Sequence, residues 1–172
     1  MLDQSRTELQ AAVATVEPGV RARRPDAHRW SVNEILEHLA LVERRFEGMV
    51  GEAIAKAQSV GLDAERDPRM PLAEGLRTVV RDRSGRRKAP DAVVPTGTLD
   101  DAAAWQAVEQ ARQSFRQRIG SADGLALGSV TAEHHRWGPL TVYQWVEVLA
   151  NHEARHAEQI TEVGEMLRSA GV

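Results

Sequence analysis

The sequence predicts an all-α protein: an antiparallel four-helix bundle in which one long crossover joins two of the helices. Four stretches carry apolar residues at steps of three and four, the spacing of one face of an α-helix. Two of these stretches open with the sequence of a capping box. Residues 61–97 lack this periodicity and contain four prolines, which favours a crossover over a linker between domains. We therefore expect a single domain over residues 1–172.

The first two helices are predicted from their ends. The first covers residues 3–16 and stops before Pro18. The second starts after Ser31, whose hydroxyl can cap the first turn, while Glu34 completes the capping box. Trp30 precedes this cap and can pack against the first turn. The apolar face then continues to about residue 59, before Gly61.

The crossover and the last two helices follow the same logic. A short helical piece is expected at residues 72–80, and the basic segment from Arg81 to Lys88 is interpreted as a solvated loop. The third helix is expected to open near Thr98 and to run to about residue 119. Residues 121–138 are interpreted as a connection broken by glycines. Thr141 then caps the fourth helix, with Gln144 completing a second capping box, and this helix continues towards Leu167.

Composition excludes several classes of protein. A hydrophobic content of 42% and a charged content of 27% are typical of a soluble globular chain. The net charge is −3, with both signs interspersed, which argues against a nucleic-acid or membrane surface. There is no cysteine, so disulfides, thiolate ligands and a cysteine nucleophile are excluded. No apolar run approaches the roughly 20 residues of a membrane span, and no signal-peptide pattern is present, so we expect a cytoplasmic location.

Three histidines predict a metal site. His152 and His156 lie four residues apart on the apolar face of the fourth helix, where two imidazoles can reach one ion. His38 lies on the apolar face of the second helix, two turns beyond Ser31. Neighbouring helices of a bundle can bring the three rings together, and buried imidazoles need partners.

Three neutral imidazoles with one open position form a ligand set of catalytic Zn²⁺, which is the expected ion; Ni²⁺ and Fe²⁺ are the alternatives. The competing interpretation is structural. Histidines in a core are often hydrogen-bonded to backbone carbonyls or carboxylates, and the spacing alone does not separate the two cases. His28, His134 and His135 fall outside the helices and are predicted to be surface or loop-tethering residues.

The segment His152 to His156 reads HEARH, which satisfies the H-E-x-x-H motif of zinc proteases. We reject that reading because no further histidine follows His156 to supply the third ligand, and little of the sequence is typical of strands. Glu153 is then expected to be a solvated carboxylate, with orientation of a ligand or of a bound water as the alternative.

Three stretches resemble the DinB-like superfamily of metal-binding bundle proteins. The first is WSVNEILEHL, from Trp30 to Leu39, and the second is RKAPDAVVPTG, from Arg87 to Gly97. The third runs from His134 through GPLT to His152 and His156. It departs from the family pattern at His135, where the family usually has proline.

The resemblance implies a four-helix bundle with one long crossover, often dimeric, whose metal triad is matched by His38, His152 and His156. Characterised relatives include transferases and isomerases that use a low-molecular-weight thiol such as bacillithiol or mycothiol, and other members are grouped as metal-dependent hydrolases. We therefore expect a metal-dependent enzyme, a thiol-dependent S-transferase acting on a small electrophile, with a homodimer as a further expectation. A metal-dependent hydrolase and a non-catalytic helical binding protein are the alternatives.

Overall fold

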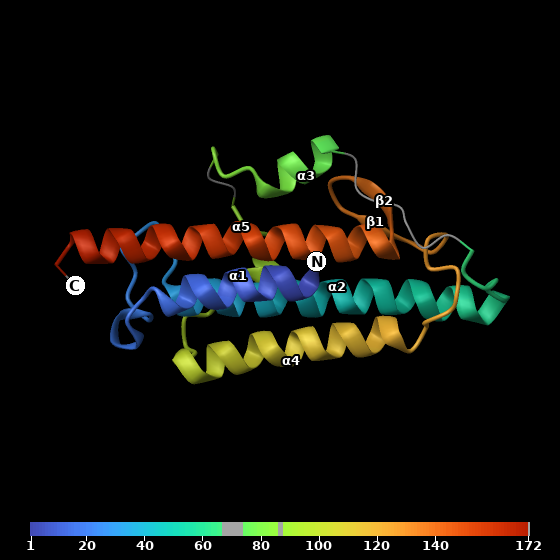
Figure 1. Ribbon diagram of the computed structural model, residues 1–172, viewed down its shortest axis with the longest axis horizontal. Helices are drawn as coiled ribbons and strands as arrows, with labels where there is room; N and C mark the ends of the chain where they lie inside the picture. The colour runs from blue at the N-terminus through green and yellow to red at the C-terminus, as the bar shows by residue number, and fades with distance from the viewer. Residues whose placement is uncertain (67–73, 86–87, 172) are drawn as a thin grey trace.

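The computed structural model describes residues 1–66, 74–85 and 88–171. Its long helices are α1 (Leu2–Ala14), α2 (Val32–Val60), α4 (Asp101–Gly120) and α5 (Val142–Ser169), and they lie side by side (Figure 1). Helices α1 and α5 run in one direction and α2 and α4 in the other. Because α2 and α4 run in the same direction, the chain must return along the bundle between them. The predicted bundle with one long crossover is confirmed.

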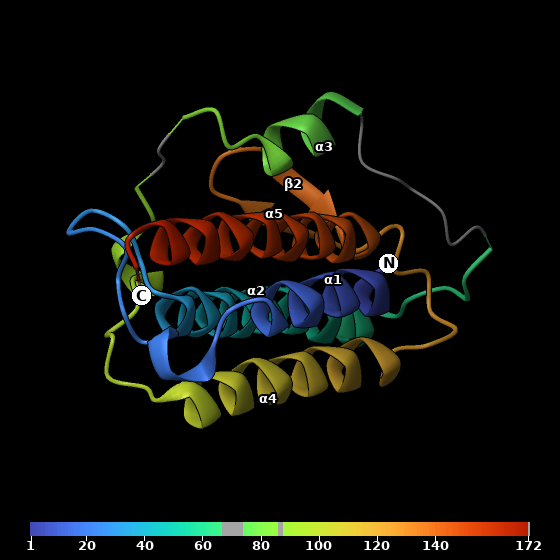
Figure 2. The ribbon, with the colours of Figure 1, turned by 60° about the vertical axis from the view of Figure 1, so that its left-hand side comes forward.

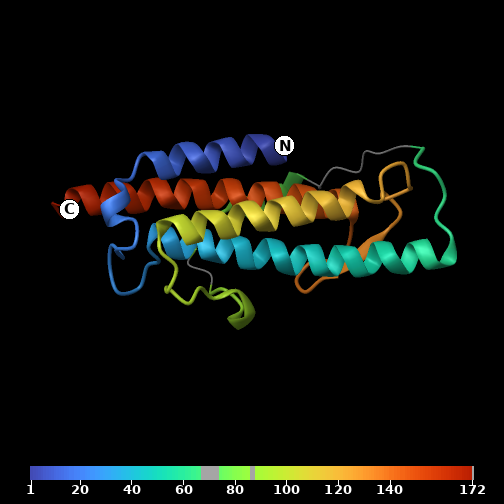
Figure 3. The same ribbon diagram turned by 90° about the horizontal axis from the view of Figure 1, so that it is seen from below.

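The helices pack in two main pairs. Helix α1 lies along α5, and α4 lies along α2, as Figure 3 shows from below. The two pairs meet where α2 packs against α5. This contact matters for function, because α2 carries His38 and α5 carries His152 and His156.

Both predicted capping boxes are present. Ser31 Oγ accepts a hydrogen bond from the Glu34 backbone N–H at 3.2 Å, and the Glu34 carboxylate accepts from the Ser31 N–H at 2.8 Å. Thr141 and Gln144 form the same pair of hydrogen bonds at the start of α5, at 3.2 and 2.9 Å. These caps fix where the two helices begin, and so fix the heights of the histidines along the bundle.

The start of α4 was predicted wrongly. The helix begins at Asp101 and not near Thr98, because Asp100 is the N-cap and accepts from the Ala103 N–H at 2.8 Å. The Thr98 hydroxyl instead hydrogen-bonds to the Thr96 hydroxyl at 2.8 Å. The first helix also ends earlier than predicted, at Ala14.

The crossover contains helix α3 (Glu74–Arg81) and the 3₁₀ turn η2 (Asp91–Val93), and a second 3₁₀ turn, η1 (Pro18–Val20), follows α1. The expected helical piece at residues 72–80 is thus found from Glu74, and its first two positions lie outside the described residues. Helix α3 lies over α5 on the side away from α4 (Figure 2). The crossover therefore covers the α5 side of the bundle as well as joining α2 to α4.

A β-hairpin was not predicted. Strands β1 (Thr131–His134) and β2 (Gly138–Thr141) pair antiparallel within the segment interpreted as an irregular connection. Each strand has four residues and no alternation of apolar and polar side chains, so the sequence lacks the usual strand signal. Gly138 supplies the positive φ of +74° that the tight turn needs.

The apolar core has two parts with a buried charged layer between them. Glu43 on α2, Arg112 on α4 and Glu153 on α5 are all almost fully buried, and each lies along its helix between residues of the two apolar clusters. The cluster nearer the cap of α2 includes Leu9, Ile35, Leu36, Val108 and Ile160, and the other includes Val50, Phe115, Leu127, Trp145 and Leu149. Among the described residues, no helix is both long and apolar enough to cross a membrane.

Candidate metal centre

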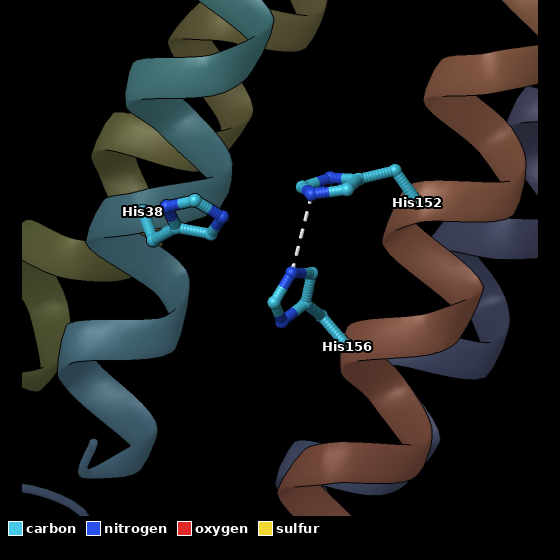
Figure 4. A group of neighbouring side chains, drawn as sticks. All are labelled: His38, His152 and His156. Carbon is cyan, nitrogen blue, oxygen red and sulfur yellow. Dashed lines mark hydrogen bonds between the residues drawn. The ribbon is translucent and has the colours of Figure 1, made fainter. Parts of the chain in front are cut away.

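His38 is held in place from outside the helix that carries it. Its side chain is 4% exposed and projects from α2 towards α5 (Figure 4). Its Nδ1 lies 2.7 Å from the backbone carbonyl oxygen of Val93, in η2. A carbonyl only accepts hydrogen bonds, so Nδ1 carries the proton and Nε2 keeps its lone pair. The crossover thereby sets the tautomer of His38.

The two histidines of α5 face His38 across the α2–α5 contact. Their Nε2 atoms lie 3.2 Å apart, one helical turn from each other (Figure 4). His156 Nδ1 lies 2.8 Å from Gln159 Oε1, which accepts its proton, so Nε2 of His156 also keeps its lone pair. His152 Nδ1 is buried and has no hydrogen-bond partner among the described residues.

The three rings meet as predicted. One nitrogen from each of His38, His152 and His156 can be chosen so that all three lie within 4.8 Å of one another. The ring centroids are 5.4 Å apart for His38 and His152, 4.9 Å for His38 and His156, and 4.5 Å for the α5 pair. The capped starts of α2 and α5 therefore place the three imidazoles at one height in the bundle.

Burial keeps the three rings neutral. Loss of hydration lowers the pKa of His38, and it lowers those of His152 and His156 well below the usual value of 6.5. Neighbouring histidines and Arg155 lower the pKa values of the α5 pair further. Neutral imidazoles offer lone pairs, and this is the form that binds metal ions.

The donor set fits a divalent ion. His38 and His156 each direct a lone pair from Nε2 while Nδ1 donates to a carbonyl or amide oxygen, the usual outer-shell arrangement of metal-binding histidines. Nitrogen ligands of tetrahedral Zn²⁺ are separated by about 3.3 Å, close to the 3.2 Å between the α5 Nε2 atoms. Two lone pairs at this distance repel each other unless a proton or a cation lies between them.

Glu153 takes no part in this site, and both interpretations offered for it were wrong. Its side chain is 2% exposed and accepts hydrogen bonds from Arg6 Nε at 2.8 Å and from Arg112 Nη2 at 2.9 Å. Ser5 Oγ donates to the same carboxylate at 2.5 Å. Glu153 is thus neither solvated nor directed at the histidines, and the HEARH segment lacks the general base of a zinc protease.

The cluster opens onto a cavity of about 1250 Å³. All three histidines line it, together with apolar side chains from the segment before α2, the hairpin and α5, among them Trp30, Trp137 and Val148. The Trp30 ring also contacts the His38 ring, at 4.8 Å between centroids. A cavity of this size beside the cluster leaves room for a small organic substrate.

His134 is a cavity residue that the sequence did not reveal. It was predicted to be a surface or loop-tethering residue, but it is 6% exposed and stacks on Trp137 at 4.1 Å between centroids. Its Nδ1 accepts a hydrogen bond from the Arg136 backbone N–H at 3.2 Å, which leaves the proton on Nε2. Burial lowers its pKa to about 4, so it stays neutral. His28 and His135 are exposed, as predicted.

Comparisons with known proteins agree with this description. A sequence profile of the DinB superfamily matches residues 1–160. An uncharacterised Bacillus subtilis (strain 168) protein, YuaE, is 26% identical over 149 residues, which cover 86% of this chain and 85% of that protein. The crystal structure of TT2238, described as a four-helix bundle protein, superposes with a TM-score of 0.60 at 16% identity and covers 94% of this chain and 93% of that one. The last similarity shows the fold alone.

Proposed function

The chain belongs to the DinB superfamily, and from that premise we propose that it is a metal-dependent enzyme that joins a small thiol to an electrophile. One observation carries the proposal: three neutral imidazoles from α2 and α5 converge on the wall of one open cavity. His38, His152 and His156 would hold the ion. A divalent ion bound by three imidazoles acts as a Lewis acid and lowers the pKa of a thiol or water that reaches it.

The surroundings of the cluster support a thiol as the nucleophile. The carboxylate nearest in sequence, Glu153, is engaged by Arg6 and Arg112, so it cannot remove a proton from water at the site. A thiol loses its proton far more easily than water, with a pKa of about 8.5, and needs no carboxylate base. In the proposed reaction the S–H proton passes to solvent, sulfur forms the new C–S bond, and the leaving group departs with the electrons of the broken bond.

The residues of the chain contribute binding and orientation. Val93 and Gln159 fix the tautomers of two of the three imidazoles, so that their lone pairs are aligned before any ion arrives. Trp30, Trp137 and Val148 provide apolar wall against which the carbon skeleton of the electrophile can pack.

Metal analysis of the full chain tests the first half of the proposal. The protein is purified without a chelating column and offered Zn²⁺, Ni²⁺ and Fe²⁺ in turn, and the metal bound per chain is measured. We expect about one ion per chain in the wild type and in His28→Ala, a control at an exposed histidine. We expect little or none in His38→Ala and His156→Ala. A wild type that binds no stoichiometric metal contradicts the proposal.

A conjugation assay tests the second half. Small thiols are combined with electrophiles such as alkyl halides and epoxides, with the metal-loaded and the metal-free protein, and thioether formation is followed. We expect thioether formation to depend on the metal and to be lost in His38→Ala. A metal-loaded protein that hydrolyses esters or amides but forms no thioether identifies the hydrolase instead.

A further inference from the structure

The cavity beside the three histidines has more basic than acidic side chains in its wall. The basic ones are Arg29, Arg45, Arg83, Lys88, Arg136 and Arg155, and the acidic ones are Glu133 and Glu162. A thiol and an uncharged electrophile give this excess of positive charge no role. The excess of positive charge in the wall therefore bears on the charge of the substrate.

Four of the six basic side chains are engaged within the protein. Arg29 and Arg83 both pair with Glu162. Arg155 Nε donates to the Asp82 carbonyl at 3.1 Å, and Lys88 Nζ lies 3.7 Å from Asp91 Oδ1. Arg45 and Arg136 differ from these four. Among the described residues, neither guanidinium has a hydrogen-bond or ion-pair partner. The wall thus contains two cations that no acid of the described chain neutralises.

These two arginines reach the cavity from different elements. Arg45 follows His38 by seven residues on α2, so the two lie two turns apart on the same face of the helix. Arg136 lies in the turn of the hairpin, between β1 and β2. The hairpin packs on α2 where the Phe46 ring meets the His134 ring, at 6.4 Å between centroids. Phe46 directly follows Arg45, and His134 lies two positions before Arg136. Both arginines are therefore close in sequence to this contact between α2 and the hairpin.

We propose that Arg45 and Arg136 form an anion-binding site in this cavity, which receives the carboxylate or phosphate group of a small organic substrate. A guanidinium presents N–H groups in a planar fork that matches both groups. Arg45 and Arg136 are both exposed, so both guanidiniums are accessible to a ligand that enters the cavity from solvent. The inference rests on the proposed function for the role of the cavity, and it deepens that function by naming the class of substrate.

Calorimetric titration of the full chain tests the site. The probes are succinate for a carboxylate, inorganic phosphate for a phosphate, and succinamide as an uncharged control. Each is titrated into metal-free and metal-loaded protein. The variants are Arg45→Gln and Arg136→Gln, with Arg44→Gln as the control, because Arg44 is exposed, adjacent to Arg45 and absent from the cavity wall. All three substitutions remove one positive charge.

We expect succinate or phosphate to bind the wild type and Arg44→Gln, and to bind each of the other two variants about tenfold more weakly or worse. Whichever probe binds identifies the anionic group, and binding should weaken with added salt. Equal losses in all three variants, or no binding of either anion to any form, overturn the proposal.

The two forms of the protein separate this inference from the proposed function. If the wild type binds no metal, the proposed function fails, and titration of the metal-free protein still decides on the anion site. If the anions bind only the metal-loaded protein, and with equal affinity in all three arginine variants, they are binding the ion itself. The anion site is then wrong while the metal site stands.

Discussion

His152 and Glu153 are consecutive in the chain but their side chains leave α5 in different directions. The His152 ring faces His156 and His38, with 3.2 Å between the two α5 Nε2 atoms. The Glu153 carboxylate faces Arg6 and Arg112, at 2.8 and 2.9 Å. Consecutive helical positions are about 100° apart, so one position can serve the cavity while the next serves the core.

Replacement of Glu153 should therefore affect stability and not metal binding. Glu153→Gln leaves the buried Arg6 and Arg112 without a full counter-charge, and we expect a loss of about 3 kcal/mol in the free energy of unfolding. Metal content per chain should remain that of the wild type. Urea unfolding and metal analysis measure the two quantities. Glu158→Gln, at an exposed position of the same helix, should change neither. If a Glu153 variant lost its metal while its stability stayed unchanged, the zinc-protease interpretation of the HEARH segment would again be supported.

The chain that follows α1 packs closely against α5 at a glycine. A Cβ built on Gly164 would lie 2.7 Å from Val16 Cγ2, closer than two non-bonded carbon atoms normally approach each other. We expect Gly164→Ala to lower the free energy of unfolding by about 1–2 kcal/mol, as overpacking outweighs the gain in helix propensity. Gly48→Ala in α2 is the matched control. Nothing lies within 4 Å of its Cβ, so it should raise stability by about 0.5–1 kcal/mol in the same urea titration. Equal changes in the two variants contradict the close packing at Gly164.

The sequence predicted the triad because each of its signals is local to one helix. Ser31 and Thr141 fix the starts of α2 and α5, and the four-residue spacing fixes the α5 histidine pair on one face. The remaining step was to expect the second and fourth predicted helices to pack side by side, as helices of a bundle with one crossover can do. The family resemblance points to the same three residues.

Other features could not be predicted because their partners are distant in the sequence. Buried Glu153 is hydrogen-bonded by Arg6 and Arg112, which lie 147 and 41 positions away in the sequence. Nothing in the HEARH segment predicts these two partners. His134 is buried because a hairpin of only four residues per strand folds onto α2. Short strands without alternation give no periodic signal. The helix was expected to open near Thr98 and Asp100 was not considered as its cap, since both residue types cap helices and only the structure shows which one does so.

The metal-free protein should lose stability as the pH falls below neutrality. The pKa of His134 is about 4 in the folded chain, against 6.5 as its ordinary value. Between these values the unfolded chain binds the proton and the folded chain does not, so the contribution of His134 is complete above pH 6.5 and is lost as the pH falls towards 4. The lowered pKa values of His38, His152 and His156 act in the same direction.

Urea unfolding of the metal-free protein between pH 7 and pH 5 measures this effect. His134→Gln should have a shallower dependence, by at most about 1.4 kcal/mol per pH unit, because one group fewer takes up a proton on unfolding. His28→Gln, at an exposed position, should follow the wild-type slope. Parallel slopes for His134→Gln and the wild type would mean that the buried ring titrates normally.

Gln159 should increase the affinity of the site for metal without contacting the ion. Its Oε1 accepts the Nδ1 proton of His156 at 2.8 Å, which holds the lone pair of Nε2 towards His152. Gln159→Ala frees the ring to change tautomer and to rotate, and loss of such an outer partner typically weakens metal binding about tenfold or more. Competition with a chromophoric chelator measures the affinity, and Glu158→Ala provides the control because that neighbouring side chain is exposed. Wild-type affinity in Gln159→Ala would mean that packing alone orients His156, since no other described side chain accepts a hydrogen bond from its Nδ1.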